Sequence, residues 1–177
     1  SLQAPATMLA ARLAKAERLG RDHLAILGLS WAGWLFDFYD LILYSFLLVP
    51  IAREFGLTRE QSSLVLGVSL GCTAIGGIVF GRLADRFGRK AVLQWTILSY
   101  SAGVFLSGLA TGLWTLLAAR IITAVGVGGE WATGQTIVSE TFPAQRRGHY
   151  GALMQTGAPL GVGLAAVMGS FFAPTFG

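Results

Sequence analysis

Long uncharged apolar runs alternate with short charged segments along this chain. Each run has about the 20 residues or more that an α-helix needs to cross the hydrocarbon core of a bilayer. In lipid, a helix satisfies its backbone polar groups within the segment itself. The pattern therefore predicts an all-α, polytopic membrane protein. Five spanning helices are expected, at residues 24–51, 62–84, 91–110, 113–140 and 150–176.

The most charged turn lies between the second and third predicted helices, in residues 81–90 (GRLADRFGRK). Short, strongly positive loops stay on the cytoplasmic side of a membrane. Most of the 13 Lys and Arg residues fall in three segments: this loop, residues 1–23 and the loop after the fourth helix. If the helices cross the membrane in alternating directions, these three segments lie on the same side. The distribution predicts a cytoplasmic N-terminus and a multi-pass protein of the plasma (inner) membrane.

Residues 1–23 are polar and precede the first apolar run. Their basic residues recur about three apart, which suits a short helix lying on an anionic membrane surface. A solvated cytoplasmic tail is the alternative. The chain begins with Ser1 and stops at Gly177 beside an apolar segment, so we expect it to be a piece of a longer protein.

Composition agrees with a membrane protein and excludes other classes. The chain is 54% hydrophobic and 12% charged, with a mean hydropathy of +0.63, whereas soluble domains are about 25% charged. The net charge of +4 is spread over loops, so no nucleic-acid partner is expected. Cys72 is the lone cysteine, and we expect no metal site or cofactor other than a proton as coupling ion. No nucleophile–base pair lies at one depth, so an enzyme is not expected.

Four ionisable residues fall within the predicted spans: Asp37, Asp40, Arg120 and Glu130. A charge at the centre of a spanning helix costs about 2.5–3.5 kcal/mol on insertion scales, so such residues pair or face a wet cavity. Asp37 and Asp40 are three apart and share one face. Counted from the helix ends, Asp40 and Arg120 differ in depth by about 6 Å, which predicts their pairing. Glu130 is expected to border the same cavity at the depth of Asp37, without pairing with Arg120.

These residues suggest a proton-coupled site. If the Asp40–Arg120 contact opens and closes, the carboxyl group takes up and releases a proton, and the freed guanidinium holds an anionic substrate. The alternative is a permanent structural ion pair. Because Arg120 is the one cation well inside a predicted span, an organic carboxylate is favoured as cargo.

Glycines are placed for close helix packing or bending. Gly67 and Gly71, like Gly77 and Gly81, form small-xxx-small pairs in the second helix. Glycines and a proline in residues 157–163 are expected to weaken or kink the last helix.

Two charged loops resemble those of the major facilitator superfamily. Residues 81–90 resemble its loop between helices 2 and 3, and residues 140–148 (ETFPAQRRG) resemble its matching loop after helix 4. The resemblance implies cytoplasmic charge networks that latch the outward-facing state. Exposed ion pairs are individually weak, which suits a gate that breaks in each cycle. The gate residues that it implies are Gly81, Asp85, Arg86, Gly88, Arg89, Glu140 and Arg147.

The intramembrane motifs are similar to a narrower group. Residues 36–40 (FDFYD) and 120–131 (RIITAVGVGGEW) resemble helices 1 and 4 of the metabolite:proton and sialate:proton symporter branches. In proton-coupled sugar relatives, the Asp of a Tyr-Asp pair faces the helix 4 Arg, which implies the roles of Asp40 and Arg120 here. Gln155 stands where sugar porters place a Gln that contacts substrate.

The resemblance covers residues 24–177 and implies five helices of an N-terminal six-helix bundle, with a sixth helix and a C-terminal six-helix half as further partners. In such folds the substrate binds at the midplane between the halves. It implies a secondary transporter in the lipid bilayer that carries out proton-coupled symport of a small metabolite by alternating access. Sugar, polyol or zwitterion cargo, or a non-transporting transporter-like receptor, are the alternatives.

Overall fold

The described part of the chain is built from helices alone. The computed structural model describes residues 20–172, and no strand occurs among them. The all-α prediction is confirmed, whereas the basic helix expected near the N-terminus lies, up to residue 19, outside the described residues. The elements are α2 (Arg21–Glu54), α3 (Arg59–Phe87), α4 (Arg89–Gly108), α5 (Leu113–Thr141), α6 (Arg147–Gln155) and α7 (Gly157–Phe172).

The turns between the first helices have local causes. Thr58 caps α3, because its hydroxyl accepts from the Gln61 amide at 3.2 Å while the Gln61 side chain accepts from the Thr58 amide at 2.9 Å. Gly56 and Gly88 take φ angles of 62° and 92°, which residues with a side chain rarely adopt. α2 and α3 each extend three residues beyond the predicted ends, since the charged residues there remain helical.

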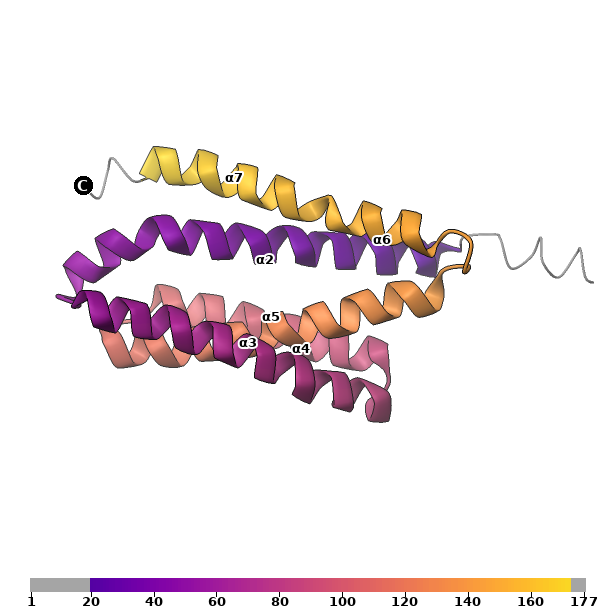
Figure 1. The fold of residues 1–177 in the computed structure, drawn as a ribbon, viewed down its shortest axis with the longest axis horizontal. Coiled ribbons are helices and arrows are strands. Elements are labelled where there is room, and N and C mark those ends of the chain that lie inside the picture. Colours follow the sequence, from indigo (N-terminus) through magenta and orange to yellow (C-terminus); the bar gives the residue numbers. More distant parts are fainter. Residues whose placement is uncertain (1–19, 173–177) are drawn as a thin grey trace, which may run out of the picture.

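The helix α5 lies at the centre of the arrangement (Figure 1). It packs along both α3 and α4, while α7 runs beside α2. Glycines permit the closest approaches: a Cβ on Gly76 of α3 would meet the backbone of Val125, and one on Gly126 would meet the backbone of Tyr100 in α4. Small residues at such crossings let spanning helices gain packing energy in lipid.

One glycine of the predicted small-residue pairs lies at a helix contact, since a Cβ on Gly77 would lie 3.3 Å from the carbonyl oxygen of Gly128 in α5. A Cβ on Gly67, Gly71 or Gly81 would meet no atom within 4 Å, so these glycines make no close approach among the described helices. The face of α3 that meets α5 carries Gly76, together with Gly77 of the predicted pairs. Spacing alone identifies small-residue pairs, but it does not say which face of the helix meets a neighbour.

The last predicted helix is divided. The segment expected at residues 150–176 breaks at Thr156, between α6 and α7. Gly157 and Gly161 then let α7 approach the backbone of α2 closely. The weak point that the glycines and proline predicted is therefore present as a break next to α2.

Length, composition and exposure indicate a multi-pass membrane protein. Four described segments are long and apolar enough to cross a membrane, namely α2, α3, α5 and Arg147–Phe171. α4 has 20 residues, or about 30 Å of helix, which matches the hydrocarbon thickness. Large apolar side chains are exposed, among them Leu70 (68%), Phe105 (69%) and Trp114 (75%). Lipid rather than water suits such a surface.

Candidate functional site

Asp40 of α2 and Arg120 of α5 form an ion pair between the two helices. The Nη1 group of Arg120 donates to both carboxylate oxygens of Asp40, at 2.9 and 3.2 Å. The two side chains are only 16% and 7% exposed, so the pair is shielded from solvent. The ring of Tyr44, one turn after Asp40, lies 4.2 Å from the guanidinium carbon and stabilises the cation through its face. The structure thus brings together the two residues that the depth argument paired.

Asp37 has a different partner. Its Oδ2 atom accepts a hydrogen bond of 2.9 Å from the indole Nε1 of Trp131, while its Oδ1 atom is buried with no partner among the described residues. The residue is 3% exposed. Trp131 follows Glu130 directly in α5, so the second acid of α2 is held by the same stretch of α5 that carries the third acid.

Glu130 is enclosed between α5 and α2. It is 2% exposed, and its Oε1 atom has no hydrogen-bond partner among the described residues. A Cβ on Gly33 would lie 2.7 Å from the Glu130 carboxyl carbon, so the carboxyl group fills the space that this glycine leaves. Gly33 precedes Asp37 by one turn on the same face of α2. Three acids and one cation therefore share the α2–α5 crossing, and no ion pair links Glu130 with Arg120 in the described part of the chain.

Three aromatic rings lie beside this crossing. Trp34 and Phe38 of α2 and Trp131 of α5 have mutual ring-centroid distances of 5.6, 5.7 and 5.9 Å, and their planes are inclined by 13–18°. All three side chains are half-buried. We call these three rings the aromatic platform. Nε1 of Trp34 is buried without an acceptor among the described residues.

Gln155 is not part of this cluster. It is exposed at the end of α6, and it makes no hydrogen bond to the acids or to Arg120 in the described structure. The neighbouring Thr156 instead accepts a hydrogen bond of 3.0 Å from Nε1 of Trp31, which fastens the α6–α7 break to α2.

The expected gate residues gather at the end of the bundle where α3 turns into α4 and α5 into α6 (Figure 1). Arg89 is their centre: its Nη2 atom lies 2.7 Å from Asp85 and 3.3 Å from Glu140, and its Nε donates to Glu140 at 3.4 Å. The two acids are 67% and 54% exposed, so each pair is individually weak.

The other implied gate residues make different contacts. Nε of Arg147 donates to the carbonyl oxygen of Phe142 at 3.1 Å, and the guanidinium of Arg86 lies 5.5 Å from the ring of Phe87. Gly88 supplies the left-handed turn that starts α4 next to Arg89. Within the described residues, the ion pairs of this end are made by Arg89 alone.

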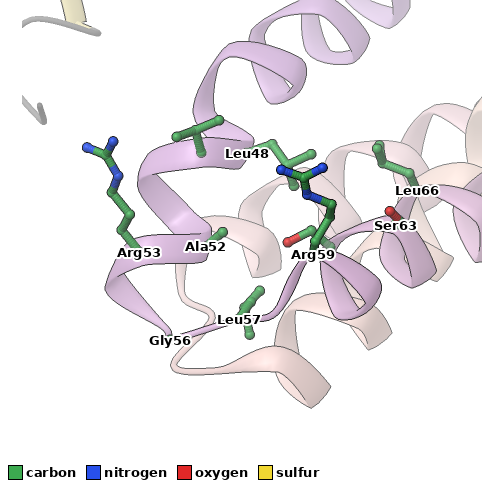
Figure 2. A pocket seen from close by; sticks show the side chains of 10 residues that line it. Leu48, Ala52, Arg53, Gly56, Leu57, Arg59, Ser63 and Leu66 are labelled. Atoms are coloured by element: carbon green, nitrogen blue, oxygen red, sulfur yellow. The ribbon is translucent and has the colours of Figure 1, made fainter.

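A pocket of about 600 Å³ lies at the opposite end of α2, where it turns into α3 (Figure 2). Arg53 and Arg59 line it together with apolar and serine side chains, and both extend away from the turn at Gly56. Ala52 also lines the pocket and follows Trp34 by 18 residues, which is five full helical turns.

Several site residues escaped the sequence patterns. Trp131 stood in the GGEW motif, but nothing in the spacing said that its indole would reach Asp37. Tyr44 follows Asp40 at i+4, a spacing that does place two side chains on one face, and this signal was available. Gly33 carried no signal of its own, because its role depends on where Glu130 points.

Comparisons with known proteins agree with this geometry. Residues 29–177 match the family described as Major Facilitator Superfamily. The chain is 35% identical to the niacin transporter NiaP of Acinetobacter baylyi over 90% of its length, and 34% identical to the sialic acid transporter NanX of Escherichia coli over 84%. It is 31% identical to the gentisate transporter of Corynebacterium glutamicum over 88%. It spans 36%, 36% and 35% of the lengths of these three relatives.

The family match covers most of the chain, and it coincides with spanning helices, a charged end centred on Arg89 and a buried Asp40–Arg120 pair. The resemblance carried by the two charged loops is thereby confirmed. This chain belongs to the Major Facilitator Superfamily.

Proposed function

We propose that the full-length protein is a secondary transporter that couples uptake of a small organic carboxylate to a proton, by alternating access. The observation that carries this proposal is the buried Asp40–Arg120 pair between two spanning helices. A buried pair is an expensive way to join two helices, since desolvating both ions offsets much of their attraction. The presence of this pair is explained if it opens during the transport cycle, so that Asp40 takes up a proton and Arg120 binds the substrate.

The exchange is electrically balanced. A substrate carboxylate that binds the guanidinium of Arg120 displaces Asp40, which would otherwise be left as an uncompensated buried charge. A proton taken up by Asp40 removes that charge, so the loaded site holds one cation, one anion and one neutral acid. Release of the substrate and the proton lets the ion pair form again. In each of these states the charges of Asp40, Arg120 and the substrate sum to zero, which a low-dielectric surrounding favours.

The relatives support a carboxylate cargo. The three relatives described above are named for niacin, sialic acid and gentisate, and each of these compounds is a carboxylic acid. Arg120 suits such a group because guanidinium matches the geometry of a carboxylate.

The orientation proposed is a plasma (inner) membrane protein with its N-terminus in the cytoplasm. The support is the positive charge of the α3–α4 end, where Arg82, Arg86, Arg89 and Lys90 cluster. Cysteines introduced singly at Arg82 and at Gly56 test it in intact cells. A membrane-impermeant thiol reagent is expected to label the cysteine at position 56 and not the one at position 82, and the reverse pattern would contradict the orientation.

Liposomes that contain the full-length protein and a pH-sensitive dye test the transport proposal. Carboxylates, sugars and betaines are added outside, and the parent protein is compared with Asp40→Asn and Arg120→Ala. Carboxylate-dependent acidification of the lumen is expected in the parent and is expected to be lost in Asp40→Asn.

Two outcomes would contradict the proposal. Entry of a carboxylate without proton movement would make the protein a facilitator and Asp40–Arg120 a structural pair. Absence of uptake across the panel, in protein that is shown to be folded, would favour a transporter-like receptor instead.

A further inference from the structure

The three rings of the aromatic platform overlap one another only in part. Its three centroids are nearly equidistant, at 5.6–5.9 Å, although the ring planes are nearly parallel. In a column of three stacked rings, the outer two would be about twice as far apart as neighbours. Each pair is therefore offset-stacked, so part of each ring face is left uncovered by the other two rings, and another flat ring can stack on that part.

The platform is fixed in place near the ion pair. Trp34 and Phe38 are one turn apart on α2, and the hydrogen bond from Trp131 to Asp37 sets the angle of the third ring. Phe38 and Asp40 differ by two residues, or about 3 Å of helical rise. Trp34 precedes Asp40 by six residues, or about 9 Å, so the platform extends from near the depth of Asp40 to nearly two turns away from it along α2.

The platform also lies on an accessible flank of α2. Its side chains are half-buried rather than enclosed, unlike Asp37 and Glu130. The pocket lined by Ala52 and Arg53 lies further along α2, at its turn into α3 (Figure 2).

We propose that the cargo is a planar aromatic carboxylate, and that Trp34, Phe38 and Trp131 select it by stacking on its ring. The inference rests on the proposed transport function and narrows its substrate class. Two of the relatives are named for niacin and gentisate, which have aromatic rings. A third is named for sialic acid, whose saturated ring has no π face, so stacking would favour the first two compounds over sialic acid. Two stacked aromatic rings attract each other more strongly than two apolar groups that bury the same area. We therefore expect the protein to take up an aromatic acid about tenfold better than a saturated acid of the same size.

Benzoate and cyclohexanecarboxylate form the matched probes, because they share the carboxylate and the ring size but only benzoate has a π face. Uptake and competition are measured for both, and for sialic acid, with the full-length protein in liposomes. The variants are Phe38→Leu, which removes a ring that makes no hydrogen bond through its side chain, and Phe36→Leu as the control. Phe36 lies two residues away on α2 and is 54% exposed outside the platform.

The expected result is a preference for benzoate of about tenfold in the parent and in Phe36→Leu, falling severalfold toward unity in Phe38→Leu. Trp131→Phe keeps a ring and loses the indole donor, so it is expected to keep most of the preference. If cyclohexanecarboxylate or sialic acid enters as well as benzoate, or if Phe38→Leu and Phe36→Leu behave alike, the inference is overturned while carboxylate transport stands. If none of the acids enters, the transport proposal itself fails, and the inference with it.

Discussion

Gly33 and Glu130 occupy one space between α2 and α5. The carboxyl carbon of Glu130 lies 2.7 Å from the position that a Cβ on Gly33 would take. The acid is 2% exposed and fills this position with a group that a membrane core disfavours. The Glu130 carboxyl group can therefore occupy this position only because residue 33 is a glycine.

We expect Gly33→Ala to destabilise the full-length protein by about 1–3 kcal/mol, because the new methyl group overlaps a buried side chain. Thermal unfolding in detergent measures the change. Gly28→Ala is the matched control on the same helix, since a Cβ there meets no atom within 4 Å. Equal melting temperatures for the two variants would show that Glu130 does not occupy this position.

Tyr44 contributes its ring and not its hydroxyl. The ring faces Arg120 at 4.2 Å, whereas the hydroxyl oxygen is buried with no hydrogen-bond partner among the described residues. Tyr44→Phe is therefore expected to leave stability unchanged or slightly raised. Tyr44→Leu is expected to lose about 1–2 kcal/mol, because it removes the aromatic face from the cation. Melting temperatures of both variants test this, and a loss in Tyr44→Phe equal to that in Tyr44→Leu would contradict it.

At the scale of elements, glycine decides how α5 meets its neighbours. A Cβ on Gly128 would lie 2.7 Å from the carbonyl carbon of Thr73 and 3.0 Å from the amide nitrogen of Gly77, both in α3. These are backbone atoms, so they cannot rotate away as a side chain can. The α3–α5 distance is therefore set by a contact between two main chains.

Gly128→Ala is expected to cost about 1–3 kcal/mol of stability, because α3 and α5 must separate to admit the methyl group. Gly134→Ala in the same helix is the control. No atom lies within 4 Å of the Cβ position at Gly134, so its gain in helix propensity of up to about 1 kcal/mol is expected to remain. Unfolding of the two variants by heat, compared side by side, measures the difference. A Gly128→Ala protein as stable as Gly134→Ala would contradict the assigned contact.

At the scale of the whole molecule, Arg89 joins two turns of the bundle. It contacts Asp85 at the end of α3 and Glu140 at the end of α5, and both acids are more than half exposed. Arg89→Gln is expected to change stability by less than about 1 kcal/mol, since exposed ion pairs are weak. The initial rate of uptake is nevertheless expected to fall severalfold, because the two turns are no longer held together in one state.

Arg82→Gln provides the control for this prediction. Arg82 is an exposed cation of the same turn, and it makes no ion pair in the described structure. Uptake rates and melting temperatures of the two variants are compared. Equal uptake rates would show that charge at this end matters only in total, and that the specific contacts of Arg89 do not gate transport.

The apolar runs and the charged turn predicted the helical fold and its family, and helix lengths predicted the Asp40–Arg120 contact. Depth is readable because a helix rises by a fixed 1.5 Å per residue. The rotation of each helix about its own axis could not be predicted, because apolar residues cover nearly every face of a spanning helix and leave little amphipathic pattern. The aromatic platform, the Trp131–Asp37 bond and the Gly33–Glu130 contact all depend on rotation. For the same reason the spacing of Gly67 and Gly71 did not show that they make no close approach to the described helices.

The glycines of α7 have a mechanical consequence. At Gly157 and Gly161, the main chain of α7 rests against the main chain of α2 near Trp31 and Leu35, with no side chain between them to deform. Two helices whose main chains are in direct contact are expected to tilt together. We therefore expect α2, which carries Asp40, and α7 to tilt together as one packed unit.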